Sequence, residues 1–261
     1  YEKDDRLGGL LRYGVPDFKL EKVHIDRRIE QMEGEGVTFF CNVNVGVDKS
    51  VEELTADYDA VLYCGGSEKP REAGIPTNDL AGIHPAMNYL VQQNKRVAGE
   101  NISSVAWNSE PILANGKHVV VVGGGDSAME EATFLTRFAS KVTVVHRRDE
   151  LRASRIMADR AKNDPKIEFA WNSEVAGLDG DDKLAGVRLR DVNTGDERVV
   201  PATGLFVAIG HIPRSELVTG VVDTDAEGYV QVVGRTTATN VDGVFVAGDA
   251  GRGASLVVWA I

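Results

Sequence analysis

The residues with the clearest chemical potential form a glycine-rich segment near the middle of the chain, where residues 119–132 read VVVVGGGDSAMEEA. This segment matches the pattern G-x-G-x-x-A, which is a weak signal by itself. Here it follows a run of valines typical of a strand and precedes residues typical of a helix, the context that dinucleotide binding requires. The glycines permit a tight turn and let backbone N–H groups approach a pyrophosphate, and the helix N-terminus adds partial positive charge. The candidate phosphate site consists of Gly123, Gly124, Gly125, Asp126, Ser127 and Ala128. The alternative is a strand-to-helix turn that binds no ligand.

Basic residues at the end of the next expected strand indicate which dinucleotide would bind. The segment HRRDELR begins 23 residues after Gly123. A ligand for a ribose 2′-hydroxyl would be Asp or Glu at this point, whereas guanidinium groups suit a 2′-phosphate through charge-assisted hydrogen bonds. The predicted NADPH site therefore adds His146, Arg147, Arg148 and Arg152, together with Gly210 at the end of a later strand. The alternative is that the arginines pair with Asp149 and Glu150 at the solvated start of a helix.

Two acidic residues are placed where they could hold a second nucleotide. Glu2 precedes a polar stretch and a Gly-Gly pair. A carboxylate in that setting holds a ribose hydroxyl and belongs to a glycine-rich turn about 20 residues earlier. Residues 243–261 (GVFVAGDAGRGASLVVWAI) read as a strand that ends at Gly248-Asp249 and continues into a helix. A carboxylate at such a corner can hold a ribityl hydroxyl while the helix N-terminus points at a flavin. The alternative is that Asp249 only caps the corner.

The elements that must position these residues follow from the hydrophobic pattern. Between residues 117 and 212, strand and helix patterns alternate in units of roughly 30 residues, which predicts a parallel sheet covered on both faces. In this region, residues 151–163 read as a helix and 166–175 as one strand. The earlier part reads as a helix over 21–36, a strand over 38–45, a short helix or turn over 51–58, a buried strand over 59–66, a helix over 85–98 and a linker over 101–116. The predicted fold class is α/β.

Composition excludes some classes of partner. The 261 residues carry 40 acidic and 29 basic side chains, a net charge of -11, which argues against nucleic acid and anionic membrane surfaces. No apolar run is long enough to span a bilayer. Cys41 and Cys64 form no Cys-x-x-Cys motif, so we expect two reduced, buried cysteines in a cytoplasmic protein. The five histidines are scattered, and no metal site is expected.

The chain resembles the two-dinucleotide-domain flavoproteins of the pyridine nucleotide-disulfide oxidoreductase superfamily. Residues 1–100 are similar to the small (beta) subunit of NADPH-dependent glutamate synthase, through YEKDDRLGGLLRYGVPDFKLEK, DRRIEQMEGEGVTF, YDAVLYCGG and GIHPAMNYLVQQNKRVAG. The tail GDAGRGASLVVWAI resembles the same family. The middle, from GGGDSAMEEATFLTRFASKVTVVHRRDELRAS through VQVVGRTTATNVDGVFVAGD, is more similar to bacterial thioredoxin reductase. A divergent homologue, a chimera and a sequence assembled from incomplete information would each give this mixture.

The resemblance implies two Rossmann-like, three-layer domains. An NADPH-binding domain over 107–212 would be inserted into a discontinuous FAD-binding domain made of 1–106 and 213–261. In these families a FAD-binding G-x-G-x-x-G precedes the segment YEKDDRLGG, so the chain is expected to be a fragment that begins after that loop. The residues implied at the FAD are Glu2, Lys3, Gly9, Leu10, Arg12, Val45, Gly65, Gly248, Asp249, Ser255 and Leu256.

The resemblance also implies a reaction, hydride transfer from NADPH to FAD followed by electron transfer to a partner, with the cofactors carrying the chemistry. The similarity of residues 1–100 implies the glutamate synthase large subunit as partner and a role in glutamate biosynthesis. The alternatives are a stand-alone NADPH-dependent reductase of ferredoxin, quinone or another small carrier, and a non-catalytic subunit that binds NADP(H).

Two features of these families are missing from this sequence. The region before the nicotinamide loop, SVAWNSEPILANGK, lacks the Cys-x-x-Cys of thioredoxin reductases, and the chain lacks the cysteine-rich iron–sulfur segment of glutamate synthase small subunits.

Overall fold

The computed structural model describes residues 1–17, 19–71, 74–75, 80–100, 111–234 and 236–251. The chain divides into two compact units: a discontinuous unit of Tyr1–Lys69 and His211–Ile261, and an inserted unit of Pro70–Gly210. The inserted unit begins well before residue 107, where the resemblance placed the domain boundary. The reason is that β3 (Ile83–Pro85) and α4 (Ala86–Val97) join its core, where the ring of Tyr89 lies 5.3 Å from that of Phe206.

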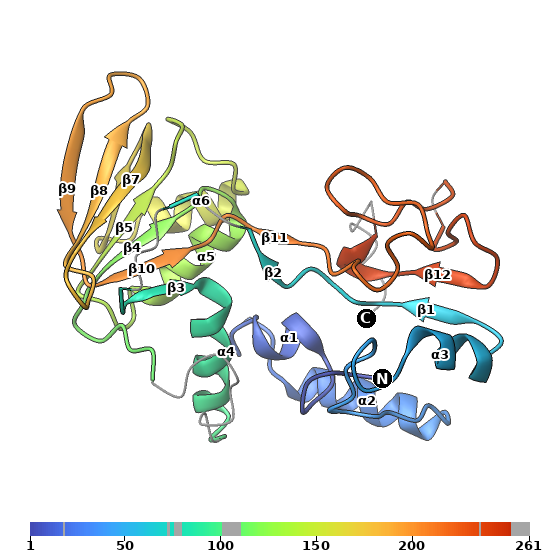
Figure 1. Ribbon diagram of the computed structural model, residues 1–261. Coiled ribbons are helices and arrows are strands. Elements are labelled where there is room, and N and C mark those ends of the chain that lie inside the picture. Colours follow the sequence, from blue (N-terminus) through green and yellow to red (C-terminus); the bar gives the residue numbers. More distant parts are fainter. Residues whose placement is uncertain (18, 72–73, 76–79, 101–110, 235, 252–261) are drawn as a thin grey trace. The chain divides into compact units, whose positions relative to one another are not determined.

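A five-stranded parallel sheet forms the centre of the inserted unit (Figure 1). Its strands in spatial order are β3, β10 (Gly204–Val207), β4 (His118–Val122), β5 (Lys141–Val145) and β6 (Ile167–Ala170). Val119, Val120 and Val121 of β4 are completely buried. A strand buried on both faces favours such a continuous run of β-branched residues.

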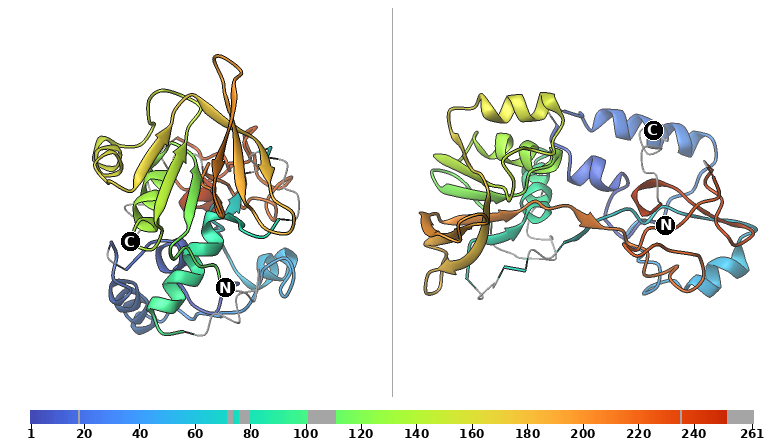
Figure 2. Two further views of the ribbon diagram at one scale, coloured as in Figure 1. Left: turned by 90° about the vertical axis from the view of Figure 1, so that its left-hand side faces the viewer. Right: turned by 90° about the horizontal axis from the view of Figure 1, so that it is seen from above.

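Alternate side chains of this sheet enter two different cores. Val119 and Val121 pack with residues of α4, α5 (Asp126–Leu135) and α6 (Arg155–Lys162) on one face. Val120 and Leu205 pack on the other face with an antiparallel sheet of β7 (Ser173–Asp179), β8 (Gly186–Asp191) and β9 (Glu197–Pro201) (Figure 1; Figure 2). Each fully buried valine contributes about 1.5–3 kcal/mol of burial free energy. The predicted parallel sheet covered on both faces is confirmed, with an antiparallel sheet as one of the covers.

The discontinuous unit contains shorter elements. Its helices are α1 (Gly9–Tyr13), α2 (Val23–Gly34) and α3 (Val51–Asp57), and a 3-10 turn, η2, spans Gly248–Ala250. Strand β1 (Val61–Tyr63) runs parallel to β12 (Val244–Val246). Strands β2 (Lys69–Pro70) and β11 (His211–Ile212) pair where the chain passes between the units. A small core of Val222, Val230, Val246 and Ala250 supports the end of β12. Within the described residues, no helix combines the length and the apolar composition that crossing a bilayer requires.

The strand predicted over residues 38–45 is wrong. This segment has extended stretches but no regular ladder, because its backbone bonds to residues 2–4 are irregular: Glu2 donates to Phe40, whereas Val43 donates back to Glu2. Asn42, with φ 58°, interrupts the extended conformation between these two bonds. Val45 forms only an isolated bridge with Lys49. Alternating apolar residues predicted a strand, but the described part of the chain supplies no regular partner for it.

Three further expectations need correction. Residues 166–175 form two strands, β6 and β7, because Asn172 takes a left-handed conformation with φ 48° between them. Helix α6 begins only at Arg155, because residues 152–154 are hydrogen-bonded to the glycine loop instead. Neither cysteine is fully buried: Cys41 is half-buried and Cys64 is exposed, and both are free thiols. The helix expected after Asp249 lies outside the described residues.

Candidate dinucleotide-binding sites

The first two glycines of the loop are required by packing. Gly123 has φ 149°, and a Cβ on it would overlap the carbonyl oxygen of Ala208 and lie 2.7 Å from the Cβ of Ala128. A Cβ on Gly124 would overlap the imidazole of His146. These contacts bring the end of β10 and the start of α5 against the end of β4. These two glycines therefore set the shape of the turn through contacts within the protein alone.

The third glycine faces open space, and this is where a phosphate would fit. A Cβ on Gly125 would meet nothing within 4 Å. Gly125 is the N-cap of α5, and its carbonyl accepts the N–H of Met129 to close the first turn. The N–H groups of Asp126, Ser127 and Ala128 have no acceptor within the described residues, as expected at a helix start. These donors, with the helix dipole, form an anion-binding N-terminus.

The arginines beside the loop are exposed, and none of them has an ion pair within the described ranges. Arg147, Arg148 and Arg152 follow β5, and none of them forms an ion pair with the carboxylates of the described residues. The alternative in which they pair with Asp149 and Glu150 is therefore not what the structure contains. Three guanidinium groups without carboxylate partners form a positive edge that suits a phosphate.

His146 packs against the glycine loop, and its side chain is buried. Its side chain is buried against Gly124, and its Nε2 lies 3.0 Å from the carbonyl oxygen of Glu150. Burial lowers the pKa of His146, and the positive charges of Arg148, Arg147 and Arg152 lower it further, against the opposing effect of the Glu150 carbonyl. The imidazole is thus kept neutral and acts as packing under the second glycine.

Direct hydrogen bonds join the glycine loop to the arginine loop, residues 146–154. The N–H groups of Arg152 and Ala153 both donate to the carbonyl of Gly124, at 2.8 and 3.1 Å. Ser154 donates both its N–H (2.8 Å) and its hydroxyl (2.7 Å) to Oδ1 of Asp126. Asp126 is therefore a link between the two loops. Gly210, with φ 95°, follows Ala208 at the end of β10, and its carbonyl accepts the N–H of Arg71. The structure thus brings the predicted NADPH residues to one edge of the sheet.

The residues implied at a FAD lie in the discontinuous unit, and several already have partners. Oε1 of Glu2 accepts the N–H of Asp4 at 3.0 Å, and Lys3 is ion-paired with Glu68. Burial raises the pKa of Glu2, and the nearby charges of Asp4 and Glu68 raise it further. Glu2 is half-buried at the start of the chain, where it orders the turn that follows.

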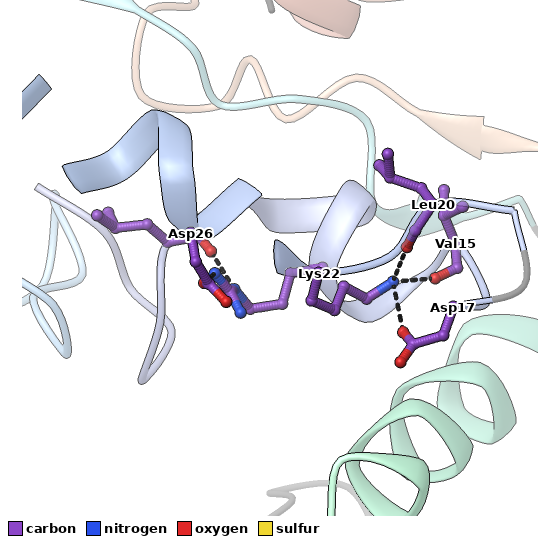
Figure 3. Close-up of polar contacts among 7 residues, drawn as sticks. Val15, Asp17, Leu20, Lys22 and Asp26 are labelled. Carbon is purple, nitrogen blue, oxygen red and sulfur yellow. Dashed lines mark hydrogen bonds and ion pairs between the residues drawn. The ribbon is translucent and has the colours of Figure 1, made fainter. Parts of the chain in front are cut away.

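Arg12 is a buried structural residue. Its guanidinium group donates to the carbonyl of Leu7 and to Oδ1 of Asp26, 2.5 Å away. Figure 3 shows the neighbouring Lys22, whose ammonium donates to the carbonyl oxygens of Val15 and Leu20 and lies 3.1 Å from Asp17. These contacts fasten the loop between α1 and α2. Gly9, with φ 47°, and the half-buried Leu10 begin α1 beside Arg12.

The Gly248–Asp249 corner is the part of the predicted FAD site that is free to bind. Gly248 has φ 80° with open space around it, and Asp249 in η2 has no hydrogen-bond partner in the described part of the chain. A Cβ on Gly65, by contrast, would overlap Tyr63, whose hydroxyl donates to the carbonyl of Arg214. Val45 lies in the isolated bridge described above. Ser255 and Leu256 lie outside the described residues.

The sequence did not reveal the roles of two residues, one on α5 and one beside the arginine loop. Glu131 on α5 is only 5% exposed, and its Oε2 has no hydrogen-bond partner in the part of the chain that the structure describes. Burial, aided by the charge of Glu130, raises the pKa of Glu131 well above its usual value. The sequence did hold a signal for this burial: Glu131 lies three residues after Ala128 and so shares the buried face of the helix. Asn172 is the second residue, and its left-handed conformation had no signal in the local pattern. Among the described residues, no group of His, Cys, Asp and Glu is arranged to hold a metal ion.

Comparison with known proteins supports both parts of the resemblance. A thioredoxin reductase of Mycolicibacterium smegmatis is 56% identical over 198 residues, which cover 74% of this chain and 63% of the relative. The small chain of NADPH glutamate synthase from Mycobacterium tuberculosis is 37% identical, and the match covers 100% of this chain and 58% of the relative. The chain thus spans less than two thirds of the length of either relative. The solved structure of Lactococcus lactis thioredoxin reductase superposes with a TM-score of 0.74 at 25% identity, covering 96% of this chain and 82% of that one.

The family model described as pyridine nucleotide-disulphide oxidoreductase matches residues 16–261, which include the glycine loop, the arginine loop and the Gly248–Asp249 corner. The fold agrees with this match, because the inserted unit is built on a parallel sheet and 96% of the chain superposes on the solved thioredoxin reductase. The chain therefore belongs to the pyridine nucleotide-disulphide oxidoreductase family.

Proposed function

We propose that this chain is the dinucleotide-binding part of an NADPH-dependent flavoprotein oxidoreductase. One observation carries the proposal: the unused N–H groups at the start of α5 and the unpaired guanidinium groups of the arginine loop lie at one sheet edge. The carbonyl of Gly124 links the two loops. A pyrophosphate and a 2′-phosphate on the same ligand need this combination. NADH offers only the first of these groups, so the proposed ligand is NADPH.

The residues of the inserted unit would bind and orient the nicotinamide nucleotide. The N–H groups of Asp126, Ser127 and Ala128 would bind the pyrophosphate, and Arg147, Arg148 and Arg152 would bind the 2′-phosphate. Bound NADPH supplies a hydride and bound FAD accepts it, so no acid–base side chain is required at this step. What the protein adds is a fixed position for the nucleotide, since the arginine loop is already fastened to Gly124 and Asp126 before binding.

The fit to FAD rests on the corner at the end of β12. The carboxylate of Asp249, unpartnered among the described residues, would hold a ribityl hydroxyl, and Gly248 leaves room for the approach. Glu2 would hold a ribose hydroxyl, although its Oε1 already accepts from Asp4. We therefore assign FAD binding to the discontinuous unit and NADPH binding to the inserted unit. The other implied FAD residues stay predictions.

The proposed electron acceptor is the large subunit of glutamate synthase, which would place the reaction in glutamate biosynthesis. The support is the match to a glutamate synthase small chain along the whole of this chain. The higher identity to a thioredoxin reductase over 74% of the chain favours a second candidate, a stand-alone reductase of a small electron carrier. Two free thiols, Cys41 and Cys64, support placing the protein in a reducing compartment, the cytoplasm.

The absorbance spectrum of the full-length protein tests the proposal. We expect flavin bands that bleach when NADPH is added without oxygen. Glutamate formation from 2-oxoglutarate and glutamine, after addition of the large subunit, would support the glutamate synthase assignment. Bleaching without glutamate formation would support the stand-alone reductase, and NADPH binding without flavin would support a non-catalytic subunit. A colourless protein that does not bind NADPH contradicts the proposal as a whole.

A further inference from the structure

We infer that Asn172 is a positioning residue that sets the preference of the inserted unit for NADPH over NADH, by holding the backbone of the arginine loop. The inference rests on the proposed function, since it concerns the arginines assigned to the 2′-phosphate. It adds a residue outside both loops, in the turn between β6 and β7.

The backbone of Asn172 is left-handed. Its φ is 48°, and it shares this property with only one other non-glycine residue of the described chain, Asn42, with φ 58°. The left-handed region is costly for most residues and is tolerated best by glycine and asparagine. This single residue turns the chain sharply from β6, in the parallel sheet, into β7, in the antiparallel sheet.

The turn at Asn172 holds the arginine loop through its backbone. The N–H of Asn172 donates to the carbonyl of Arg148 at 3.2 Å, and the N–H of Ser173 donates to the carbonyl of His146 at 3.0 Å. The carbonyl of Asn172 accepts the N–H of Val192 at 2.7 Å, which anchors the turn to the end of β8. Residues 146 and 148 flank Arg147, so these two bonds hold the backbone of the two consecutive arginines.

The side chain of Asn172 does not hold the arginine loop; the backbone of the turn does. The side chain makes no hydrogen bond to any residue within the described ranges, and it is half-buried. The contribution of asparagine is therefore its tolerance of the left-handed conformation. This predicts that glycine, which has no side chain but adopts the same conformation, can replace it. Alanine removes the side chain as well and does not favour that conformation.

The position of the turn explains why the effect should fall on NADPH. The pyrophosphate donors at the start of α5 are held by Gly123 and by the bonds from residues 152–154 to Gly124 and Asp126, none of which involves Asn172. Moving the backbone at Arg147 and Arg148 changes the distance of two guanidinium groups from the 2′-phosphate. It leaves the part of the site that NADH shares unchanged.

The test measures binding of NADP⁺ and NAD⁺ to the full-length protein by titration calorimetry, since the oxidised nucleotides reduce no flavin. For Asn172→Ala we expect the Kd of NADP⁺ to rise about tenfold, equivalent to about 1.4 kcal/mol, while that of NAD⁺ changes less than about twofold. Asn172→Gly should keep both values within about twofold of the wild type. Asn42→Ala is the matched control, because it strains the same backbone conformation in the other unit.

The outcomes separate this inference from the proposed function. A wild type that prefers NADP⁺, together with an Asn172→Ala variant of equal preference, overturns the inference and leaves the proposed function standing. Equal losses for both nucleotides, or a glycine variant as weak as the alanine variant, overturn it as well. A wild type without preference for NADP⁺ overturns both. Thermal melting checks that each variant is folded, and Asn172→His, a residue type that occupies the left-handed region more often than alanine, replaces the alanine variant if that protein is unfolded at the assay temperature.

Discussion

At the scale of single residues, the three arginines of the arginine loop differ from the exposed Arg188 and Arg190 in having no ion pair among the described residues. Exposed arginines in an acidic protein usually lie near a carboxylate, yet Arg147, Arg148 and Arg152 have no ion pair among the described residues. Reversing two of these charges should therefore cost little stability. For the double variant Arg147→Glu/Arg148→Glu we expect the Kd of NADP⁺ to rise about tenfold to a hundredfold, the loss of about one charged hydrogen bond.

The control for this prediction is a second pair of exposed arginines with the same charge. Arg188 and Arg190 lie on β8 and are paired with Asp179 and Glu174 at 2.5 Å. Arg188→Glu/Arg190→Glu changes the net charge equally and should leave nucleotide binding unchanged. The measurement is the ratio of the Kd values of NADP⁺ and NAD⁺. An equal loss of affinity for both nucleotides in the Arg147/Arg148 variant would contradict the 2′-phosphate assignment.

Glu131 leads to a prediction about pH. Its folded-state pKa lies well above the usual 4.5 because the side chain is buried, so the folded protein keeps a neutral carboxyl where the unfolded chain is ionised. The wild type therefore loses stability as pH rises above about 4.5, by up to about 1.4 kcal/mol per pH unit, until the folded-state pKa is reached. Glu131→Gln removes this dependence, so its stability advantage over the wild type should grow from pH 5 to pH 8.

Denaturant unfolding of the wild type and Glu131→Gln at several pH values checks this prediction. Glu197→Gln is the control, because the Glu197 side chain on β9 is exposed. The advantage of Glu131→Gln should grow with pH relative to this control. A constant difference across the range would show that the buried carboxyl is ionised in the folded protein, against the direction expected from its burial.

At the scale of elements, different glycines of the glycine loop serve packing and ligand binding. Gly123→Ala places a methyl group against the Ala208 carbonyl and Ala128 at a φ of 149°, so it should lower the melting temperature markedly. Gly125→Ala meets open space at a φ of −94°, so the fold should be kept. The added methyl group would occupy the place of a phosphate, however, and should weaken NADP⁺ and NAD⁺ alike.

Melting curves and titrations of the two glycine variants, done side by side, check this separation. The expected pattern is a loss of stability in the Gly123→Ala variant and a loss of affinity, without a loss of stability, in the Gly125→Ala variant. If Gly125→Ala binds both nucleotides like the wild type, then the start of α5 is not the pyrophosphate site. Its exposed N–H groups would then be ordinary unpaired groups of a helix terminus.

The same elements show which features a single sequence can predict. The strand over 118–122 and the helix after it were predictable, because the valine run, the glycines and the helix-forming residues agree within fifteen positions. The strand over 38–45 was not, because its alternating pattern is local, whereas a strand needs a regular partner elsewhere. The division of 166–175 into two strands depends on one residue, Asn172, and on bonds to Arg148 and Val192. These bonds join segments twenty or more positions apart.

In the candidate site, too, the local sequence predicts some features and distant contacts decide others. Its residue types follow from motif and spacing, so the glycine loop and the arginines were both expected, and the structure places them together. The structural roles of Arg12 and His146 were not expected, because burial decides them: the buried guanidinium group of Arg12 binds Leu7 and Asp26 and holds α1 to α2. A motif identifies which chemistry is available, and the contacts decide which side chains are free to use it.

At the scale of the whole molecule, the two kinds of relative describe different acceptors. The matches to thioredoxin reductases are stronger but cover about three quarters of the chain, and the match to a glutamate synthase small chain is weaker but complete. Nucleotide binding is common to both classes in our proposal, whereas the acceptor depends on parts of the protein that differ. The higher identity to thioredoxin reductases therefore does not by itself select the partner.

The cysteines provide the test that separates these acceptors. A thioredoxin reductase needs two neighbouring thiols, but Cys41 and Cys64 are separated by 22 residues, and both are free thiols. We expect the full-length protein to pass electrons from NADPH to ferricyanide and not to reduce thioredoxin, with a known thioredoxin reductase as positive control. Cys41→Ser/Cys64→Ser should leave the ferricyanide rate unchanged, because hydride transfer between the cofactors needs no thiol. Reduction of thioredoxin that disappears in this double variant would show that the two cysteines form a redox pair despite their spacing, and it would move the protein to the other class.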